Sequence, residues 1–228
     1  FKNGRPFHAT IFAKDQAGLK ELFKVVSQSN IEYYYRVPRI LRSMLSSRRD
    51  SFLLGSGCAE GEVFEAMMQK GYNEAKEKAK FYDYIEIMPK AIYRPLIKKE
   101  LIRNEHHLEE IIQNLVRLGE ELGKPVVATG NVHYLNPEDK IYREILLTSL
   151  NNGVPQEYPD AHLRTTDEML KEFAFLGEEK AYEVVVKNSN WVSEQLEEIT
   201  PVKDDLFTPK IEGAADEITK LSYDKAHE

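Results

Sequence analysis

The sequence predicts an α/β fold in which parallel strands are joined by outer helices. Two observations predict it. Stretches with the composition of strands alternate four times with stretches of helical periodicity, and such an order implies parallel strands joined by right-handed crossovers. Four strands are too few for a closed barrel. We therefore expect either an open doubly wound sheet or part of a (β/α) barrel whose earlier strands lie outside this chain.

The four predicted strands differ in character. Residues 7–13 (FHATIFA) are β-rich, and residues 52–57 (FLLGSG) are a short apolar run that leads into glycines. Residues 82–88 (YDYIEIM) alternate between polar and apolar side chains. Residues 124–129 (KPVVAT) form the fourth strand and lead into the loop 130–133 (GNVH).

Caps and periodicity predict the helices. Asp15 can cap a first helix, in which apolar side chains recur at helical spacing over residues 19–26. Further helices are expected at 60–69, at 73–80 and at 105–122, where Gly123 ends a long amphipathic pattern.

The second half of the chain is mainly helical. This pattern extends from residue 133 to about residue 198, with a Pro/Gly/Asn-rich break at 151–159. Residues 204–228 are polar and have the character of a linker. We therefore expect a domain at 1–200, followed by a linker at 201–228 that leads into another module.

Composition restricts the class of protein. The 228 residues are 42% hydrophobic and 30% charged, as in soluble globular proteins, and the net charge is −7. That charge argues against strong nucleic-acid binding by this segment alone. Cys58 is the single cysteine, which excludes an internal disulfide and fits a reducing cytoplasm. The start at Phe1 without Met suggests a fragment of a longer protein, and no apolar run predicts a membrane partner.

Three polar residues lie in or just after predicted strands: His8, Cys58 and His133. In parallel α/β folds, sites assemble where strands end, and His and Cys are the usual ligands of zinc. No pair of them has a diagnostic short spacing, so the residues alone leave two interpretations open. In the first, the three residues are metal ligands. In the second, His8 is a hydrogen-bonded histidine of a strand, Cys58 is a small buried residue, and His133 caps a helix from a loop.

A basic stretch follows Tyr33, Tyr34 and Tyr35 and is the one local patch suited to contact with DNA. We favour the interpretation that this stretch is the rim of a surface helix beside aromatic core residues. Residues that bind nucleic acid therefore cannot be named from the sequence. The basic side chains are Arg36, Arg39, Arg42, Arg48 and Arg49.

Several longer stretches together resemble the PHP domain of bacterial replicative polymerases, most closely the PolC-type DNA polymerase III α subunit. The resemblance covers nearly the whole chain. Its stretches are RPFHATIFAKDQAGLKELFKVVS (5–27), YRVPRI (35–40), GSGCAEGEVFEAMM (55–68), GKPVVATGNVHYLNPEDKIYREIL (123–146), HLRTTDEML (162–170) and FLGEEKA (175–181).

This resemblance implies part of a distorted (β/α) PHP barrel with a multi-metal cleft. His8, Cys58 and His133 match metal-ligand positions of the family, and Asn131 stands where many relatives carry aspartate. The other family ligands have no counterpart in this chain. The resemblance therefore implies a partial or degraded site for a divalent metal, zinc or manganese.

The resemblance also implies a parent protein. The parent is expected to be a DNA-directed DNA polymerase that uses Mg²⁺ in its palm domain and contains an inserted 3′–5′ exonuclease, after which this segment follows. Expected partners are the exonuclease and polymerase domains, replisome subunits, and DNA through the parent. The segment itself is expected to be architectural and inactive alone. The alternatives are an active metallophosphoesterase that hydrolyses pyrophosphate or a 3′ end, and a free-standing histidinol-phosphatase-like enzyme.

Overall fold

The computed structural model describes residues 2, 4–150, 157–202, 204–206 and 208–228, so residues 151–156 of the predicted break lie outside the described residues. All four predicted strands are present in shorter form. They are β1 (Thr10–Ala13), β4 (Phe52–Gly55), β5 (Ile85–Ile87) and β6 (Val126–Ala128).

The predicted helices are also present, together with elements that the sequence analysis did not predict. The helices are α1 (Gln16–Ile31), α2 (Arg42–Ser46), α3 (Glu62–Gln69), α4 (Tyr72–Ala79), α5 (Lys90–Lys98), α6 (Glu105–Leu122), α7 (Lys140–Leu150), α8 (Thr166–Glu172), α9 (Glu178–Tyr182), α10 (Asn188–Glu194) and α11 (Ala214–His227). A small hairpin joins β2 (Tyr34–Tyr35) to β3 (Val37–Pro38), and a π-helical turn, Glu183–Lys187, connects α9 to α10.

Strand direction differs from the prediction at one pair. β5 and β6 are parallel as expected, and a parallel bridge between Gly55 and Tyr84 links the end of β4 to the start of β5. β1 and β4, however, are antiparallel, so the expectation of parallel strands throughout is wrong. The described strands form a mixed α/β arrangement of small sheets, and a barrel stays a prediction.

The reversal of β4 results from the path of the chain between the two strands. After α1, the chain runs back along this helix from its end to its start. At the end of α1, the N–H of Tyr33 donates to the carbonyl of Gln28. Just before the start of α1, the N–H of Lys14 donates to the carbonyl of Ser51. β4 therefore begins beside the end of β1 and runs back along it. A single crossover helix would instead have given a parallel pair.

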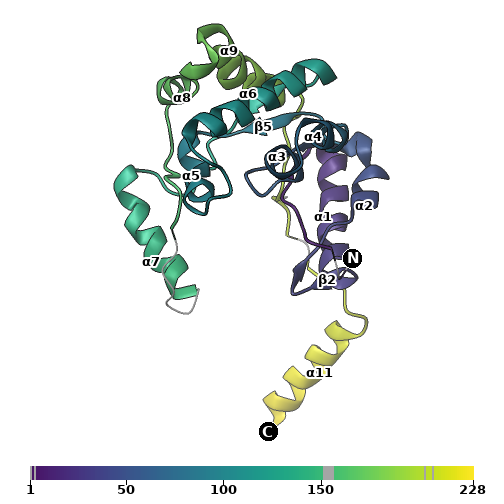
Figure 1. Cartoon of the computed structure of the whole chain (residues 1–228). Helices are drawn as coiled ribbons and strands as arrows, with labels where there is room; N and C mark the ends of the chain where they lie inside the picture. The colour runs from purple at the N-terminus through teal and green to yellow at the C-terminus, as the bar shows by residue number, and fades with distance from the viewer. Residues whose placement is uncertain (1, 3, 151–156, 203, 207) are drawn as a thin grey trace.

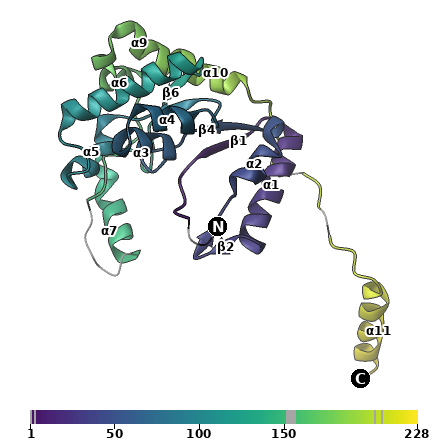
Figure 2. The ribbon, with the colours of Figure 1, turned by 45° about the vertical axis from the view of Figure 1, so that its right-hand side comes forward.

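The core lies between the strands and α6. Leu108, Ile112, Leu115 and Leu118 on α6 are fully buried and pack in one cluster with the side chains of β4, β5 and β6 that point to the same face. Each such side chain stabilises the fold by about 1.5–3 kcal/mol. The opposite face is covered at one end by α10, where Trp191 packs in a second cluster with Leu53, Tyr84 and Val127. Figure 2 shows α6 and α10 beside these strands.

The C-terminal segment is fastened to the start of α1. The N–H of Glu197 donates to the carbonyl of Lys14 at 2.8 Å. The side-chain amide of Gln16 accepts from the N–H of Thr200 at 3.0 Å and donates to its carbonyl at 3.2 Å. We call this pair of hydrogen bonds the Gln16–Thr200 clasp.

Two helices extend away from this body. Neither α7 nor α11 contains a buried residue, and both views show α11 apart from the other elements (Figure 1, Figure 2). The predicted linker 201–228 thus contains a regular helix. None of the described helices is both long and apolar enough to cross a membrane.

Candidate functional site

A cavity of about 880 Å³ is lined by His8, Cys58 and Asn131 among the predicted site residues. His8 comes from the segment before β1, Cys58 from the loop after β4, Glu86 from β5, and Thr129 and Asn131 from the chain after β6; all five line the cavity. We call it the His8–Cys58 cavity.

His8 and Cys58 are in direct contact although 50 residues separate them. Nδ1 of His8 lies 3.2 Å from Sγ of Cys58. The other ring nitrogen, Nε2, lies 3.1 Å from a carboxylate oxygen of Glu60. The backbone holds this arrangement, because the N–H of His8 donates to the carbonyl of Glu60 and His8 forms a parallel bridge with Gly61.

The glycine-rich loop around Cys58 supports this contact. Gly57 has a φ of +78°, and a Cβ at this position would lie 2.6 Å from the carbonyl oxygen of His8. Only glycine combines this conformation with so close an approach. Gly57 therefore acts as a turn residue.

Glu86 is a buried carboxylate that the sequence analysis missed. Its side chain accepts from the N–H of Gly57 at 3.1 Å and from the hydroxyl of Thr129 at 3.2 Å, and its own N–H donates to Ser56. The residue is 6% exposed. The only sequence signal for it is a charged residue between Ile85 and Ile87, two apolar residues of a short strand.

The thiol of Cys58 is not activated as a nucleophile. Burial raises its pKa, and the negative charges of Glu60 and Glu86 act in the same direction, against hydrogen bonding from the backbone. A thiol with a raised pKa is protonated near pH 7. Cys58 therefore contributes sulfur as a contact atom without the thiolate that covalent catalysis needs.

The loop after β6 places Asn131 at the His8–Cys58 cavity and His133 outside the residues that line it. Asn131 lines the cavity and has a φ of +45°, a left-handed conformation that asparagine adopts more readily than most residues. His133 does not line the His8–Cys58 cavity, and its N–H donates to the carbonyl of Ala161. Partial burial, and then the charge of Arg143, lower the pKa of His133, so its imidazole is neutral near pH 7.

The side chains present do not complete a metal site. His8 and Cys58 are donors that zinc prefers, but Asn131 is neutral and the carboxylate of Glu86 already accepts hydrogen bonds from Gly57 and Thr129. Across the described part of the chain, no group of three or more His, Cys, Asp or Glu side chains could hold a metal ion. A structural zinc site needs four ligands, and the only histidine and cysteine that line this cavity are His8 and Cys58.

Two arginines of the basic stretch also line the cavity, and several charges of the stretch are paired. Arg39 and Arg42 line the His8–Cys58 cavity. Arg42 forms an ion pair with Glu62, and its guanidinium also lies 4.2 Å from the centroid of the Phe81 ring. Arg48 pairs with Glu21, and Arg49 with Asp83. This pairing fits a surface rim beside aromatic side chains.

Comparison with known proteins matches part of the chain to a family. The family model described as "PHP domain" matches residues 2–93. Residues 2–93 form a PHP domain. The match covers β1, β4, β5 and both His8 and Cys58, whereas Asn131 and His133 lie beyond it. The extension of the PHP domain to residue 200 stays a prediction.

Beyond the PHP domain, the likeness continues to the end of the chain. The chain is 59% identical over its full length to "DNA polymerase III PolC-type" of Listeria welshimeri and 58% identical to the protein of that name from Latilactobacillus sakei. The Bacillus subtilis protein of that name is 56% identical over 99% of the chain. The chain spans 16% of the length of each of these relatives. It is therefore homologous to a segment of a much larger polymerase.

Proposed function

We propose that this chain is a segment of a PolC-type replicative DNA polymerase III α subunit, in which its PHP region is mainly architectural. The observation that carries the proposal is the identity of 55–59% with polymerases of this type over essentially the whole chain. The parent extends a primer by nucleotidyl transfer, with Mg²⁺ held in a palm domain, and contains a 3′–5′ exonuclease. The PHP region braces these domains and reaches DNA and the replisome through them.

The donor set of the His8–Cys58 cavity supports an architectural role over hydrolysis. Metal-assisted hydrolysis needs a metal with an open coordination position for water, held by about three protein ligands. Here His8 and Cys58 contact each other, and Glu86 fastens the loop at Gly57 to the chain at Thr129. The contacts of Glu86 serve to hold three segments together.

The test uses the full-length polymerase that contains this chain. Primer extension and phosphate release from pyrophosphate, with Zn²⁺ or Mn²⁺ added, are measured for the wild type, for Cys58→Ser and for His106→Ala. His106 is a matched control because its side chain is 80% exposed on α6. We expect primer extension by all three proteins, within about twofold of one another, and no phosphate release.

Two results would contradict the proposal in different ways. A full-length protein that does not extend a primer would refute the assignment to a polymerase. Metal-dependent phosphate release that Cys58→Ser abolishes and His106→Ala leaves intact would instead establish the alternative, an active metallophosphoesterase that acts on pyrophosphate or a 3′ end.

A further inference from the structure

Helix α7 has its apolar side facing solvent and its polar side facing the protein. Five large apolar side chains on it are between 52% and 79% exposed: Ile141, Tyr142, Ile145, Leu146 and Leu150. At 3.6 residues per turn these positions cover about half of the circumference. The less exposed positions on the other half are Lys140, Arg143, Glu144, Leu147 and Thr148, of which Leu147 alone is apolar. A helix of a globular protein normally has the reverse orientation.

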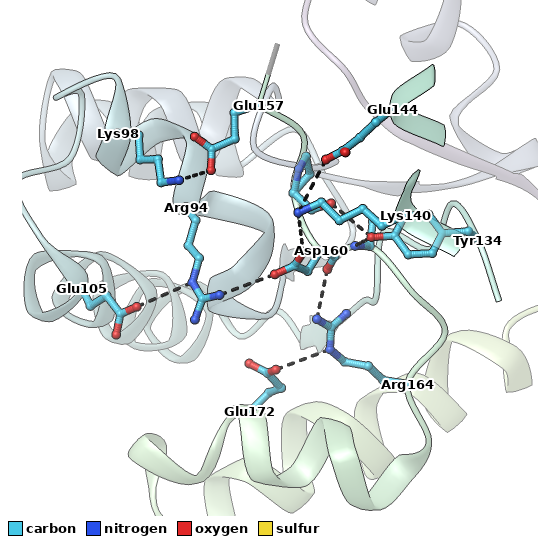
Figure 3. Close-up of polar contacts among 12 residues, drawn as sticks. Arg94, Lys98, Glu105, Tyr134, Lys140, Glu144, Glu157, Asp160, Arg164 and Glu172 are labelled. Atoms are coloured by element: carbon cyan, nitrogen blue, oxygen red, sulfur yellow. Dashed lines mark hydrogen bonds and ion pairs between the residues drawn. The ribbon is translucent and has the colours of Figure 1, made fainter. Parts of the chain in front are cut away.

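The polar side of α7 is tied to the body by an ion-pair network (Figure 3). Lys140 lies 2.6 Å from the carboxylate of Asp160, which also pairs with Arg94 of α5 at 3.5 Å. Arg164, whose side chain is 3% exposed, donates to the backbone carbonyl of Asp160 and pairs with Glu172 of α8. These contacts fix the first turn of α7 and leave its apolar side pointing away from the body.

An isolated helix of this length needs a partner. α7 has 11 residues, and helices shorter than roughly 12–15 residues are marginal in water without tertiary packing. No residue of α7 is buried in this chain. Large exposed apolar patches on otherwise polar proteins mark interaction sites. The stripe of five side chains therefore has the properties of one side of an interface.

The relatives indicate what covers the stripe. This chain corresponds to 16% of the length of polymerases that match it from end to end, so most of the surface that such a protein offers lies outside the described body. We propose that the α7 stripe (Ile141, Tyr142, Ile145, Leu146 and Leu150) docks into an apolar groove on another domain of the same polymerase chain. This inference rests on the proposed function.

Hydrogen–deuterium exchange on the full-length polymerase tests the interface. Sedimentation first establishes that the protein is a monomer, and primer extension that it is active. In this protein we expect the amides of 141–150 to exchange at least about tenfold more slowly than in a synthetic peptide of residues 138–150. The double variant Ile145→Asp/Leu146→Asp should lose this protection and melt at a lower temperature.

A control and three outcomes complete the test. Ile31→Asp removes an apolar side chain that is 83% exposed at the end of α1, and it should leave the exchange of α7 unchanged. Exchange of α7 at the rate of the peptide in active monomeric wild type would overturn the interface alone. Protection that appears only when the protein dimerises would overturn it in favour of a second copy. Absent primer extension with a protected α7 would refute the proposed function and leave the interface standing.

Discussion

The sequence alone pointed to His8 and Cys58 as site residues, but it did not point to Glu86. The sequence placed His8 near the start of a predicted strand and Cys58 just after another, and the structure brings the two side chains within 3.2 Å. Glu86 belongs to a strand whose alternating pattern reads as half solvated. Its role depends on Gly57 and Thr129, which are 29 and 43 residues away. No local pattern encodes such partners, so burial of the carboxylate emerged only from the fold.

We expect the residue at position 131 to influence how well the cavity can bind a metal. A carboxylate binds a divalent cation more strongly than a neutral amide does. We therefore expect Asn131→Asp to strengthen Zn²⁺ or Mn²⁺ binding in the full-length protein, where upstream residues can add ligands. In the isolated chain the same change should have little effect, because too few ligands remain. Aspartate also tolerates the φ of +45° at this position.

Isothermal titration of the metal into the wild type and the Asn131→Asp variant measures this effect, both in the full-length protein and in the isolated chain. Asn136→Asp, in the same loop but outside the residues that line the cavity, is the control. If the wild type and Asn131→Asp bind the metal equally in the full-length protein, position 131 is not a ligand position.

Asp160 makes the stability of the α7 attachment depend on pH. Its hydrogen bond with Lys140 is the largest cause that lowers its pKa below the ordinary value of 3.8, aided by Arg94 and Arg164 and opposed by burial. Because the folded-state pKa is depressed, the stabilisation is present above the unfolded pKa and is lost as pH falls through the folded one. We expect the difference in unfolding free energy between wild type and Asp160→Asn to shrink from about pH 5 to pH 3.

Chemical denaturation at several pH values checks this expectation. Asp224→Asn, at an exposed position of α11, serves as the control and should show no comparable narrowing. A difference between wild type and Asp160→Asn that stays constant over this range would mean that the ion pairs of Asp160 contribute nothing to folding.

At the scale of elements, helix caps predicted the helix ends correctly, whereas the direction of strand pairing was harder to predict. The predicted helix 105–122 matches α6 at both ends, because Asn104 caps its start and Gly123 adopts the left-handed conformation at its end. Asp15 caps α1 as predicted, accepting from the N–H of Gly18. Both signals act within a few residues. The direction of β4 was predicted wrongly because it depends on the return of the whole segment between α1 and β4.

Gly119 tests how closely α6 packs on the strands. Alanine in the interior of a helix normally stabilises by about 1 kcal/mol relative to glycine. Here an added Cβ would lie 2.3 Å from Cγ2 of Val126 and 2.9 Å from the carbonyl oxygen of Lys124. Such overpacking costs about 1–3 kcal/mol. We expect Gly119→Ala to lower the free energy of unfolding by about 1 kcal/mol, as measured by chemical denaturation.

The matched control for Gly119→Ala is Gln113→Ala, at an exposed position of the same helix, which should change stability by less than about 0.5 kcal/mol. A Gly119→Ala protein more stable than wild type would show that α6 can move away from β6 without loss.

At the scale of the whole molecule, we expect no polymerase activity from this chain alone. Its net charge of −7 opposes binding to the phosphates of a primer–template. The described residues also lack a group of carboxylates that could hold the catalytic metals. A primer-extension assay with the purified 228-residue chain should yield no product, and the full-length polymerase provides the positive control. Template-dependent incorporation by the chain alone would refute this expectation.

The Gln16–Thr200 clasp gives a pull on the C-terminal segment a second route into the protein, beside the covalent chain. A pull on the C-terminal helix α11 reaches the rest of the protein at Thr200, and there it is transferred to Gln16 at the start of α1. The adjacent bond from Glu197 passes the same load to Lys14, directly after β1. We therefore expect part of a pull on the C-terminal segment to enter the protein beside the β1–β4 pair, next to the segment in which His8 contacts Cys58.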